Sequence, residues 1–119
     1  MKIGFTGTRR GMSDSQRLQF LSVMRWFHDV TEFHHGAAIG ADSEADEMVR
    51  QMNGVDTVVK HPATKGKELE RNRDIVEVAD ILIAVPRDDR EELRSGTWAT
   101  IRYARAKGIP IVMLSRRRI

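Results

Sequence analysis

The stretch that decides the fold is DILIAVP, residues Asp80–Pro86, a continuous apolar run between polar flanks. A short apolar run ended by proline is typical of a strand that is buried on both faces. Such strands occur in parallel sheets, whose connections are usually helices. We therefore expect helical segments on both sides of this run and an α/β fold.

Shorter strand-like runs alternate with helical patterns along the rest of the chain. The other expected strands are residues 2–6, 31–35, 55–61 and 109–114, and the expected helices are residues 13–30, 41–53, 67–79 and 95–108. Ser13 or Asp14 can cap the first helix, and Asn53-Gly54 is a stop signal for the second. Apolar residues recur at helical spacing in the first helix: Leu18, Leu21, Met24 and Phe27.

This alternation predicts one three-layer, Rossmann-like domain over residues 1–119, with a five-stranded parallel sheet and helices on both faces. Right-handed crossovers with one reversal of winding give the strand order 3-2-1-4-5. In such a sheet the ligand crevice lies at the carboxyl ends of the strands, where the order reverses. The loops after strands one, two and four should therefore meet at one site.

The composition favours a globular cytoplasmic domain without a membrane partner. Hydrophobic residues make up 40% of the chain and charged residues 31%, which argues against disorder. No apolar run approaches the roughly 20 residues that cross a bilayer, and the first residues lack a secretion-signal pattern. The chain has no cysteine, which excludes disulfides and thiolate metal sites. A net charge of +3 is compatible with anionic partners but is too small for a dedicated nucleic-acid binder.

The three loops expected at the crevice share one chemical character. They read GTRRGMS at residues 7–13, GAAIGAD at residues 36–42 and SGTW at residues 95–98, and each leads into a helix. Glycine lets backbone N–H groups approach a ligand closely, and a helix N-terminus favours an anion. Neither a Walker loop nor the dinucleotide fingerprint is present. Three such loops at one edge predict a pocket for a phosphate-bearing ligand.

Charged and polar residues of these loops are candidate ligand contacts. At least one of Arg9 and Arg10 is expected to face the crevice, where a guanidinium can bind phosphate or carboxylate. His34 and His35 point to opposite sides of a strand, and His35, next to a glycine loop, is the site candidate. The histidines have no further ligands at suitable spacing, so no metal site is expected. Asp42 either caps the second helix or meets a ligand hydroxyl.

Structural explanations stay open for several of these residues. Gly7 and Gly11 can serve a turn, and Gly36 and Gly40 can allow tight packing of strand and helix. Asn72, early in the third helix, either lies on a solvated face or reaches a base or hydroxyl. The charged run at residues 87–94 is either a solvated loop or a lid over the crevice. Several large side chains are expected in the core or an interface: Met12, Trp26, Phe27 and Met48. The basic tail at residues 116–118 is expected to be a solubilising end.

Taken in order, four segments of the chain resemble the SLOG superfamily of Rossmann-like proteins: GFTGTRRG, HHGAAIGAD, HPA…ERNRDIVEVADILIAVP and SGTWATIRYARAKGIPIVML. Within it, the chain is most similar to the small single-domain group related to the YpsA proteins. The superfamily also includes the DNA-processing protein A group and the "lonely guy" phosphoribohydrolases. The resemblance covers nearly the whole chain, and it implies a pocket for a nucleotide or nucleotide-derived ligand in a homodimer.

The resemblance also implies roles for individual positions. It assigns ligand binding to two loops, to an arginine–asparagine pair and to a phosphate-binding turn: Gly7, Thr8 and Arg9; Gly36, Gly40 and Asp42; Arg71 and Asn72; Ser95, Gly96 and Thr97. Three further residues lie in or beside these segments and complete the predicted binding set: Arg10, Ala37 and Pro86.

One departure from the family pattern concerns catalysis. In the phosphoribohydrolases a glutamate follows three residues after the glycine-threonine pair, and here that position is Thr100. The arginine that partners this glutamate corresponds to Arg71. Cleavage of an N-glycosidic bond usually uses a carboxylate, for which the chain offers Asp42, Glu91 or Glu92. The catalytic candidates are Arg71, Asp42 and His35.

Three functions follow in order of preference. The first is a binding module that senses or sequesters a nucleotide-like molecule without a cofactor, because the glycine loops and Arg9 are present and the glutamate is not. The second is a nucleoside-phosphate N-glycosidase or a nucleoside transferase. The third is single-stranded DNA binding, which a 6% content of aromatic residues disfavours because few rings are present for base stacking.

Overall fold

The computed structural model describes residues 1–116, which form one five-stranded parallel sheet with four helices. The strands are β1 (Lys2–Gly7), β2 (Val30–His35), β3 (Val55–Lys60), β4 (Ile81–Val85) and β5 (Ile111–Met113). The helices are α1 (Asp14–Trp26), α2 (Ala41–Arg50), α3 (Glu68–Val78) and α4 (Gly96–Lys107). The strand order is β3-β2-β1-β4-β5, so the predicted fold class and order are confirmed.

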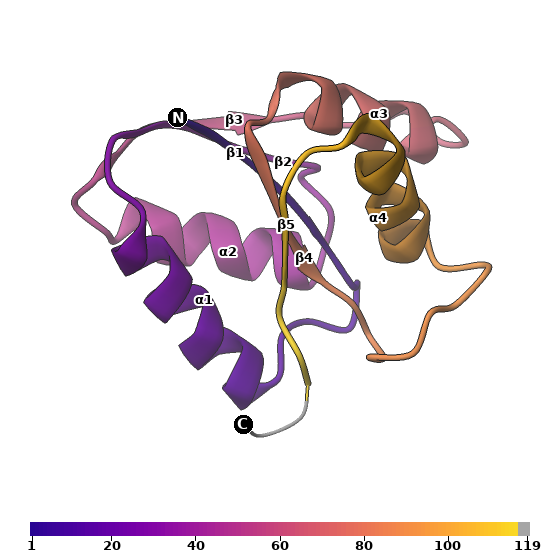
Figure 1. Ribbon diagram of the computed structural model, residues 1–119, viewed down its shortest axis with the longest axis horizontal. Helices are drawn as coiled ribbons and strands as arrows, with labels where there is room; N and C mark the ends of the chain where they lie inside the picture. The colour runs from indigo at the N-terminus through magenta and orange to yellow at the C-terminus, as the bar shows by residue number, and fades with distance from the viewer. Residues whose placement is uncertain (117–119) are drawn as a thin grey trace.

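The helices cover the two faces of the sheet in pairs. Figure 1 shows α1 and α2 on one side of the strands and α3 and α4 on the other. The core under α1 and α2 is built around three fully buried rings, Phe5, Phe20 and Phe33, whose centroids lie 5.6–5.9 Å apart. Such edge-on and tilted contacts add to the stability gained by burying apolar area. The opposite core is smaller and includes Leu82 and Trp98.

Helix α1 is shorter than its sequence pattern suggests. It begins as predicted, with Ser13 and Gln16 forming a capping box, but it ends at Trp26. The prediction of helix as far as Val30 was wrong, because Asp29 takes a left-handed conformation (φ 59°) and Val30 already pairs in β2.

The predicted apolar face of α1 is also partly wrong. Leu18 is 68% exposed, whereas Gln16, Phe20 and Met24 are buried. Steps of four residues, as from 16 to 20 to 24, stay closer to one face of a helix than repeated steps of three. The buried polar side chain of Gln16 hid this face from a reading based on apolar residues alone.

The remaining boundaries follow the sequence signals with small differences. Helix α2 ends at Arg50, three residues before the predicted end at Asn53. Helix α4 ends at Lys107 and is capped by Gly108, which is left-handed (φ 77°). Strand β5 covers only residues 111–113, and it starts after Pro110, which has no N–H to donate. No helix in residues 1–116 combines the length and apolar character needed to cross a membrane. Residues 117–119, which include most of the basic tail, lie outside the described part.

Candidate ligand-binding site

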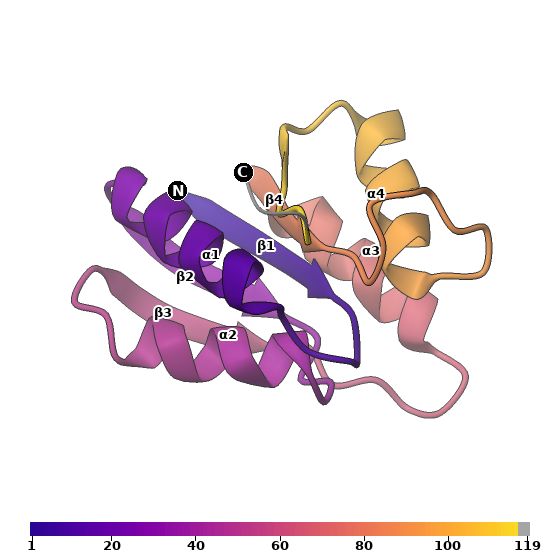
Figure 2. The same cartoon turned by 90° about the horizontal axis from the view of Figure 1, so that it is seen from below.

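The loops after β1, β2 and β4 meet the start of α3 around a cavity of about 670 Å³ at the carboxyl edge of the sheet. Figure 2 shows the loops after β1 and β4 and the start of α3 at this edge. The structure brings ten predicted residues together in its wall: Gly7, Thr8, Arg9, Arg10, Asp42, Arg71, Asn72, Ser95, Gly96 and Thr97. The other lining residues are Thr6, Ala38, Glu68, Leu69, Arg87, Glu92 and Arg94.

Two glycines of the predicted set allow the loops to pack against each other. Gly40 has φ 83°, and a methyl group there would collide with the backbone of Arg9. Gly7 faces Ala41, with 2.5 Å between the Ala41 Cβ and the position a Cβ on Gly7 would take. Gly40 does not line the cavity, so its observed role is the tight packing that the sequence left open.

Four other predicted residues lie outside the cavity wall: Gly36, Ala37, Pro86 and His35. His35 is buried, and its Nδ1 accepts a hydrogen bond of 2.9 Å from the Ala37 N–H. The proton therefore sits on Nε2, which donates to Asp46 at 2.6 Å. Both ring nitrogens are used within the protein, so His35 supports the second loop, in which Ala37 is left-handed (φ 55°).

Asp42 holds the second loop from the other side. Its Oδ2 accepts hydrogen bonds from the N–H groups of Gly36 (3.0 Å) and Ala38 (3.3 Å). The predicted capping of α2 was wrong, because the N-cap residue is Gly40 and no side chain caps that helix. Asp42 is only 5% exposed, and its Oδ1 has no hydrogen-bond partner within residues 1–116.

The protonation of Asp42 is set by opposing effects. Burial raises the pKa of its carboxyl above the usual value, because the charged form loses its hydration. The Ala38 and Gly36 N–H groups and the nearby Arg71 guanidinium act in the opposite direction and stabilise the carboxylate.

Arg71 links three parts of the site. Its Nη1 donates to the carbonyl oxygens of Gly36 and His61, the second of these at 3.2 Å. Its Nε donates to Asn72 Oδ1 at 2.8 Å. Because the Asn72 oxygen is used in this way, its NH₂ group is the part of the amide that can donate to a ligand. Arg71 thus fixes the orientation of Asn72 as well as the position of the second loop.

The first turn of α4 forms the opposite wall. Ser95 caps the helix by accepting a hydrogen bond of 3.2 Å from the Trp98 N–H, and Gly96 and Thr97 follow it. First-turn N–H groups have no partner within their own helix and carry partial positive charge. Thr100 does not line the cavity, and its hydroxyl donates to the Gly96 carbonyl at 2.8 Å. Position 100, where the resemblance leads one to expect a glutamate, therefore does not face the cavity.

The charged segment at residues 87–94 supplies part of the wall. Arg87 forms an ion pair with Glu92, and both line the cavity together with Arg94. Glu91 instead forms an ion pair with Arg102 at 2.9 Å, outside the cavity. The carbonyl of residue 88 accepts a hydrogen bond from the buried Trp98 indole at 3.3 Å, which anchors the segment to α4.

Sequence reasoning missed two residues that hold the first loop. Gln16 is fully buried, and its Nε2 donates to the carbonyl oxygens of Pro86 (3.1 Å) and Leu114 (3.0 Å). Glu44 accepts a hydrogen bond of 2.6 Å from the Met12 N–H. The Ser-x-x-Gln spacing of the capping box was a signal for Gln16. No local pattern indicated Glu44, because its contact joins two elements far apart in the sequence.

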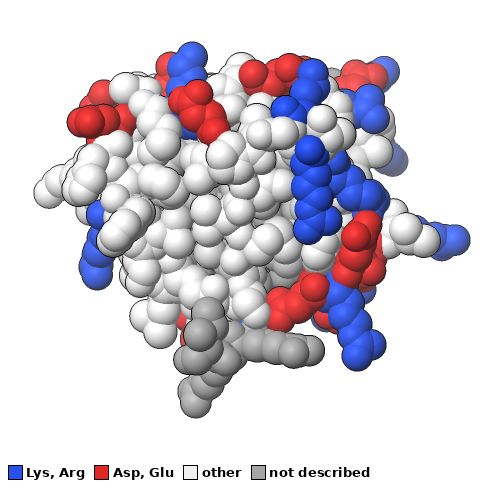
Figure 3. Space-filling model, in the orientation of Figure 1, with Lys and Arg blue, Asp and Glu red and all other residues white. Residues whose placement is uncertain are grey.

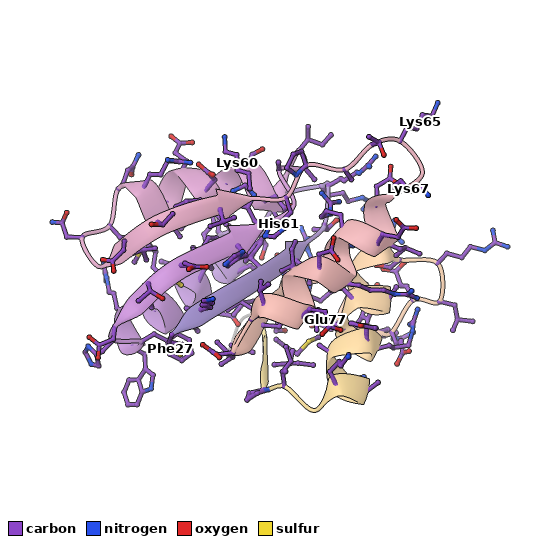
Figure 4. All side chains as sticks on the ribbon, turned by 90° about the horizontal axis from the view of Figure 1, so that it is seen from above. Phe27, Lys60, His61, Lys65, Lys67 and Glu77 are labelled. Atoms are coloured by element: carbon purple, nitrogen blue, oxygen red, sulfur yellow. The ribbon has the colours of Figure 1, made fainter. Side chains whose placement is uncertain are left out.

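A histidine pair lies outside this cavity, on the side of α3. Figure 4 labels His61, which follows β3. His34 Nδ1 and His61 Nε2 are 2.7 Å apart, and His34 Nε2 contacts Glu32 at 2.7 Å. Burial, and then the neighbouring His34, lower the pKa of His61 below its usual value. Within residues 1–116 no group of three or more His, Asp or Glu side chains is arranged to hold a metal ion.

Comparison of the chain with family models, with curated proteins and with solved structures gives no match. The fold and the edge at which the loops meet define a Rossmann-like α/β protein.

Proposed function

We propose that this chain binds a nucleotide or nucleotide-derived phosphate in the carboxyl-edge cavity, as a sensor or sequestering module in the cytoplasm. The observation that carries the proposal is the convergence of the first turn of α4 with the arginine-bearing loop after β1 around one cavity. Each feature alone is common, but together they offer backbone N–H donors and guanidinium groups to the same bound group.

The charges in the wall favour an anion. Five arginines and three acids line the cavity: Arg9, Arg10, Arg71, Arg87 and Arg94; Asp42, Glu68 and Glu92. Arg71 is held by internal hydrogen bonds, whereas Arg9 and Arg10 are exposed and can move toward a ligand. A phosphate between these arginines and the Gly96 and Thr97 N–H groups gains charge-assisted hydrogen bonds.

The remaining wall suits the organic part of a nucleotide. Leu69 is 52% exposed and offers an apolar surface, and Asn72 offers an amide donor beside it. A base has apolar faces and acceptor atoms at its edge, which match these two side chains. Membership of the SLOG superfamily is part of the same proposal, since residues from all four family-like segments line this cavity. The homodimer that the resemblance implies belongs to the proposal as well.

Mass spectrometry of molecules that co-purify with the folded protein tests the proposal, followed by thermal-shift assays with a panel of nucleotides. We expect a phosphate-bearing ligand and a rise in melting temperature. Thr97→Val should reduce that rise because it removes a hydroxyl from the cavity. Thr57→Val, at an exposed position of β3, is the matched control and should leave the rise in melting temperature unchanged. A protein that shows no shift with any nucleotide would contradict the proposal.

The alternative activity, N-glycosidic cleavage, is supported by one observation. Asp42 and Glu92 both line the cavity, so a carboxylate is available although residue 100 is threonine. Chromatographic detection of free base from nucleoside 5′-monophosphates tests this activity. Release that Asp42→Asn or Glu92→Gln abolishes would favour the enzyme over the sensor.

Single-stranded DNA binding is less well supported. Figure 3 shows positive charge gathered toward the side of α4, but negative charge is mixed with it. Arg102 and Lys107 of α4 are paired with Glu91 and Glu77 at 2.9 and 2.8 Å. A groove that follows a nucleic-acid backbone requires unneutralised positive charge and stacking rings. These ion pairs favour a small ligand in the cavity over a polyanion on the surface.

A further inference from the structure

Two buried carboxylate oxygens without a hydrogen-bond partner belong to the wall of the same cavity. Within residues 1–116, the buried side-chain nitrogen and oxygen atoms that lack a partner are Asp42 Oδ1 and Glu92 Oε1. Both residues line the carboxyl-edge cavity. Buried polar groups in proteins are nearly always paired, so this coincidence indicates that a bound group completes the site.

A fully ionised phosphate group cannot supply the missing partner. Its oxygens accept hydrogen bonds, as do the oxygens of a carboxylate, and two acceptors carrying negative charge repel each other. The group that meets Asp42 must therefore donate a hydrogen bond or carry positive charge. The ligand needs a donor in addition to the phosphate that the arginines and α4 attract.

The surroundings of Asp42 favour a small neutral donor. Asp42 is 5% exposed, and its Oδ2 is fixed by the Gly36 and Ala38 N–H groups, so Oδ1 cannot turn away to water. The Arg71 guanidinium already lies near enough to stabilise the carboxylate, which makes a further cation unnecessary for its charge. In a nucleotide, the ribose hydroxyls are small donors close to the phosphate.

We infer that the ligand carries free ribose hydroxyls, one of which donates to Asp42 Oδ1, and that the cavity selects ribonucleotides over deoxyribonucleotides. This inference rests on the proposed binding of a nucleotide-like phosphate. Glu92 Oε1 is the acceptor for a second donor of the ligand, since its other oxygen pairs with Arg87. Asp42 is thus a specificity-determining residue, while the first turn of α4 and the arginines bind the phosphate.

Isothermal titration calorimetry of the full chain tests the inference. The probes are the four ribonucleoside 5′-monophosphates, their 2′-deoxy and 3′-deoxy counterparts, and inorganic phosphate, each in EDTA and again with Mg²⁺. We expect at least one ribonucleotide to bind roughly tenfold or more tightly than its 2′-deoxy or 3′-deoxy counterpart, because loss of the hydroxyl leaves a buried acceptor unpaired.

Substitutions of Asp42 and Glu92 test whether these carboxylates cause the ribose preference. Asp42→Asn retains an oxygen for the Gly36 and Ala38 N–H groups but turns an NH₂ group toward the ligand, so the ribose preference should fall below about threefold. Inorganic phosphate should bind this variant at least as well as it binds the wild type. Glu92→Gln, which leaves the second loop untouched, should reduce the preference severalfold. Glu47→Gln, on the exposed side of α2, is the control and should not change it.

The outcomes separate the two proposals. If ribonucleotides and both deoxy forms bind the wild type equally, the selectivity is wrong although nucleotide binding stands. If no nucleotide binds, the proposed function itself fails. A ribose preference that appears only with Mg²⁺ would mean that a cation, rather than a hydroxyl, meets the carboxylates and would overturn the inference. If Asp42→Asn unfolds at a lower urea concentration than Glu47→Gln, its binding data are set aside. The ribose preference of Glu92→Gln then decides whether the carboxylates cause the selectivity.

Discussion

Two cavities of about 670 Å³ each open at opposite edges of the sheet, and their walls differ in chemistry. The cavity at the carboxyl edge is lined by glycines, hydroxyl side chains and arginines. The cavity at the amino edge lies between the ends of α1 and α2. Its wall includes Leu21, Met24, Phe27, Met48 and Met52, together with the polar Arg25, His28, Asp29, Gln51 and Asn53.

The difference between the two cavity walls follows from the parallel direction of the strands. All strands are parallel, so every crossover helix begins at the carboxyl edge and ends at the amino edge. Helix N-termini, with partial positive charge, therefore surround one cavity, while the C-termini of α1 and α2 border the other. Helix ends of opposite partial charge thus border the two cavities, and the arginines gather at the carboxyl edge, which suits a phosphate better.

The largest expected effect is a loss of stability when the buried side-chain amide of Gln16, which joins the loops at the carboxyl edge, is removed. Gln16→Leu leaves the Pro86 and Leu114 carbonyls and the Ser13 N–H without their partner. The free energy of unfolding, measured in urea, should fall by about 3–5 kcal/mol, since each buried unpaired group costs about 1–3 kcal/mol. The same substitution at the exposed Gln51 of the amino-edge cavity should change it by less than about 0.5 kcal/mol. Equal effects at the two positions would contradict this account of the site.

The second prediction concerns the contact between the first two loops. Gly40→Ala combines a left-handed backbone with a collision against Arg9, so the free energy of unfolding should fall by about 2–4 kcal/mol. Gly66→Ala is the matched control, because φ there is 87° but no atom lies within 4 Å of the added methyl. It should cost only about 1 kcal/mol. Urea unfolding measures both variants. Equal losses in the free energy of unfolding would contradict the prediction.

The third prediction contrasts two exposed arginines, one at each cavity. Arg9→Met should weaken binding of the co-purified phosphate ligand about tenfold, because it removes a charge-assisted hydrogen bond. Arg25→Met at the amino-edge cavity should leave the affinity unchanged. Calorimetric titration measures both. An equal loss in the two variants would point to general attraction by net charge rather than to the cavity.

The smallest expected effect is a pH dependence of stability. The pKa of folded His61 is lowered from the ordinary value of 6.5, so its contribution to stability is present above that pH and is lost as the pH falls toward the folded pKa. In the wild type, the free energy of unfolding in urea should be lower at pH 5.5 than at pH 7.5. This drop should be smaller in His61→Gln. His28→Gln at the amino-edge cavity, where the histidine is exposed, should retain the full drop. A full drop in both variants would assign the pH effect to other groups.

The fold could be predicted from the sequence because its signals are local. The apolar run at residues 81–85, the capping serines Ser13 and Ser95, and Gly108 each act within a few residues. The alternation of elements then fixed the sheet order through general rules of chain connection. The same rule brought three loops to one edge, and these loops supply eight of the ten predicted site residues in the cavity wall. The other two, Arg71 and Asn72, belong to α3 and were predicted from the family resemblance.

The rest depended on contacts that no local pattern records. His35 looked like a ligand contact, but its two nitrogens are used by Ala37 and Asp46. The Gly36 and Gly40 pair looked like a ligand loop, yet these glycines pack against Arg71 and Arg9. Only the three-dimensional arrangement decides whether a polar group faces the cavity or another part of the chain.

The measurement that tests the central claim most directly is an NMR titration of the ¹⁵N-labelled chain with a mixture of the four ribonucleoside 5′-monophosphates. The account predicts shifts of the Thr8, Gly96 and Thr97 amides at the carboxyl edge, and no shifts of Met48 and Met52 at the amino edge. Shifts confined to the amino edge, or no shifts at millimolar nucleotide, would contradict it.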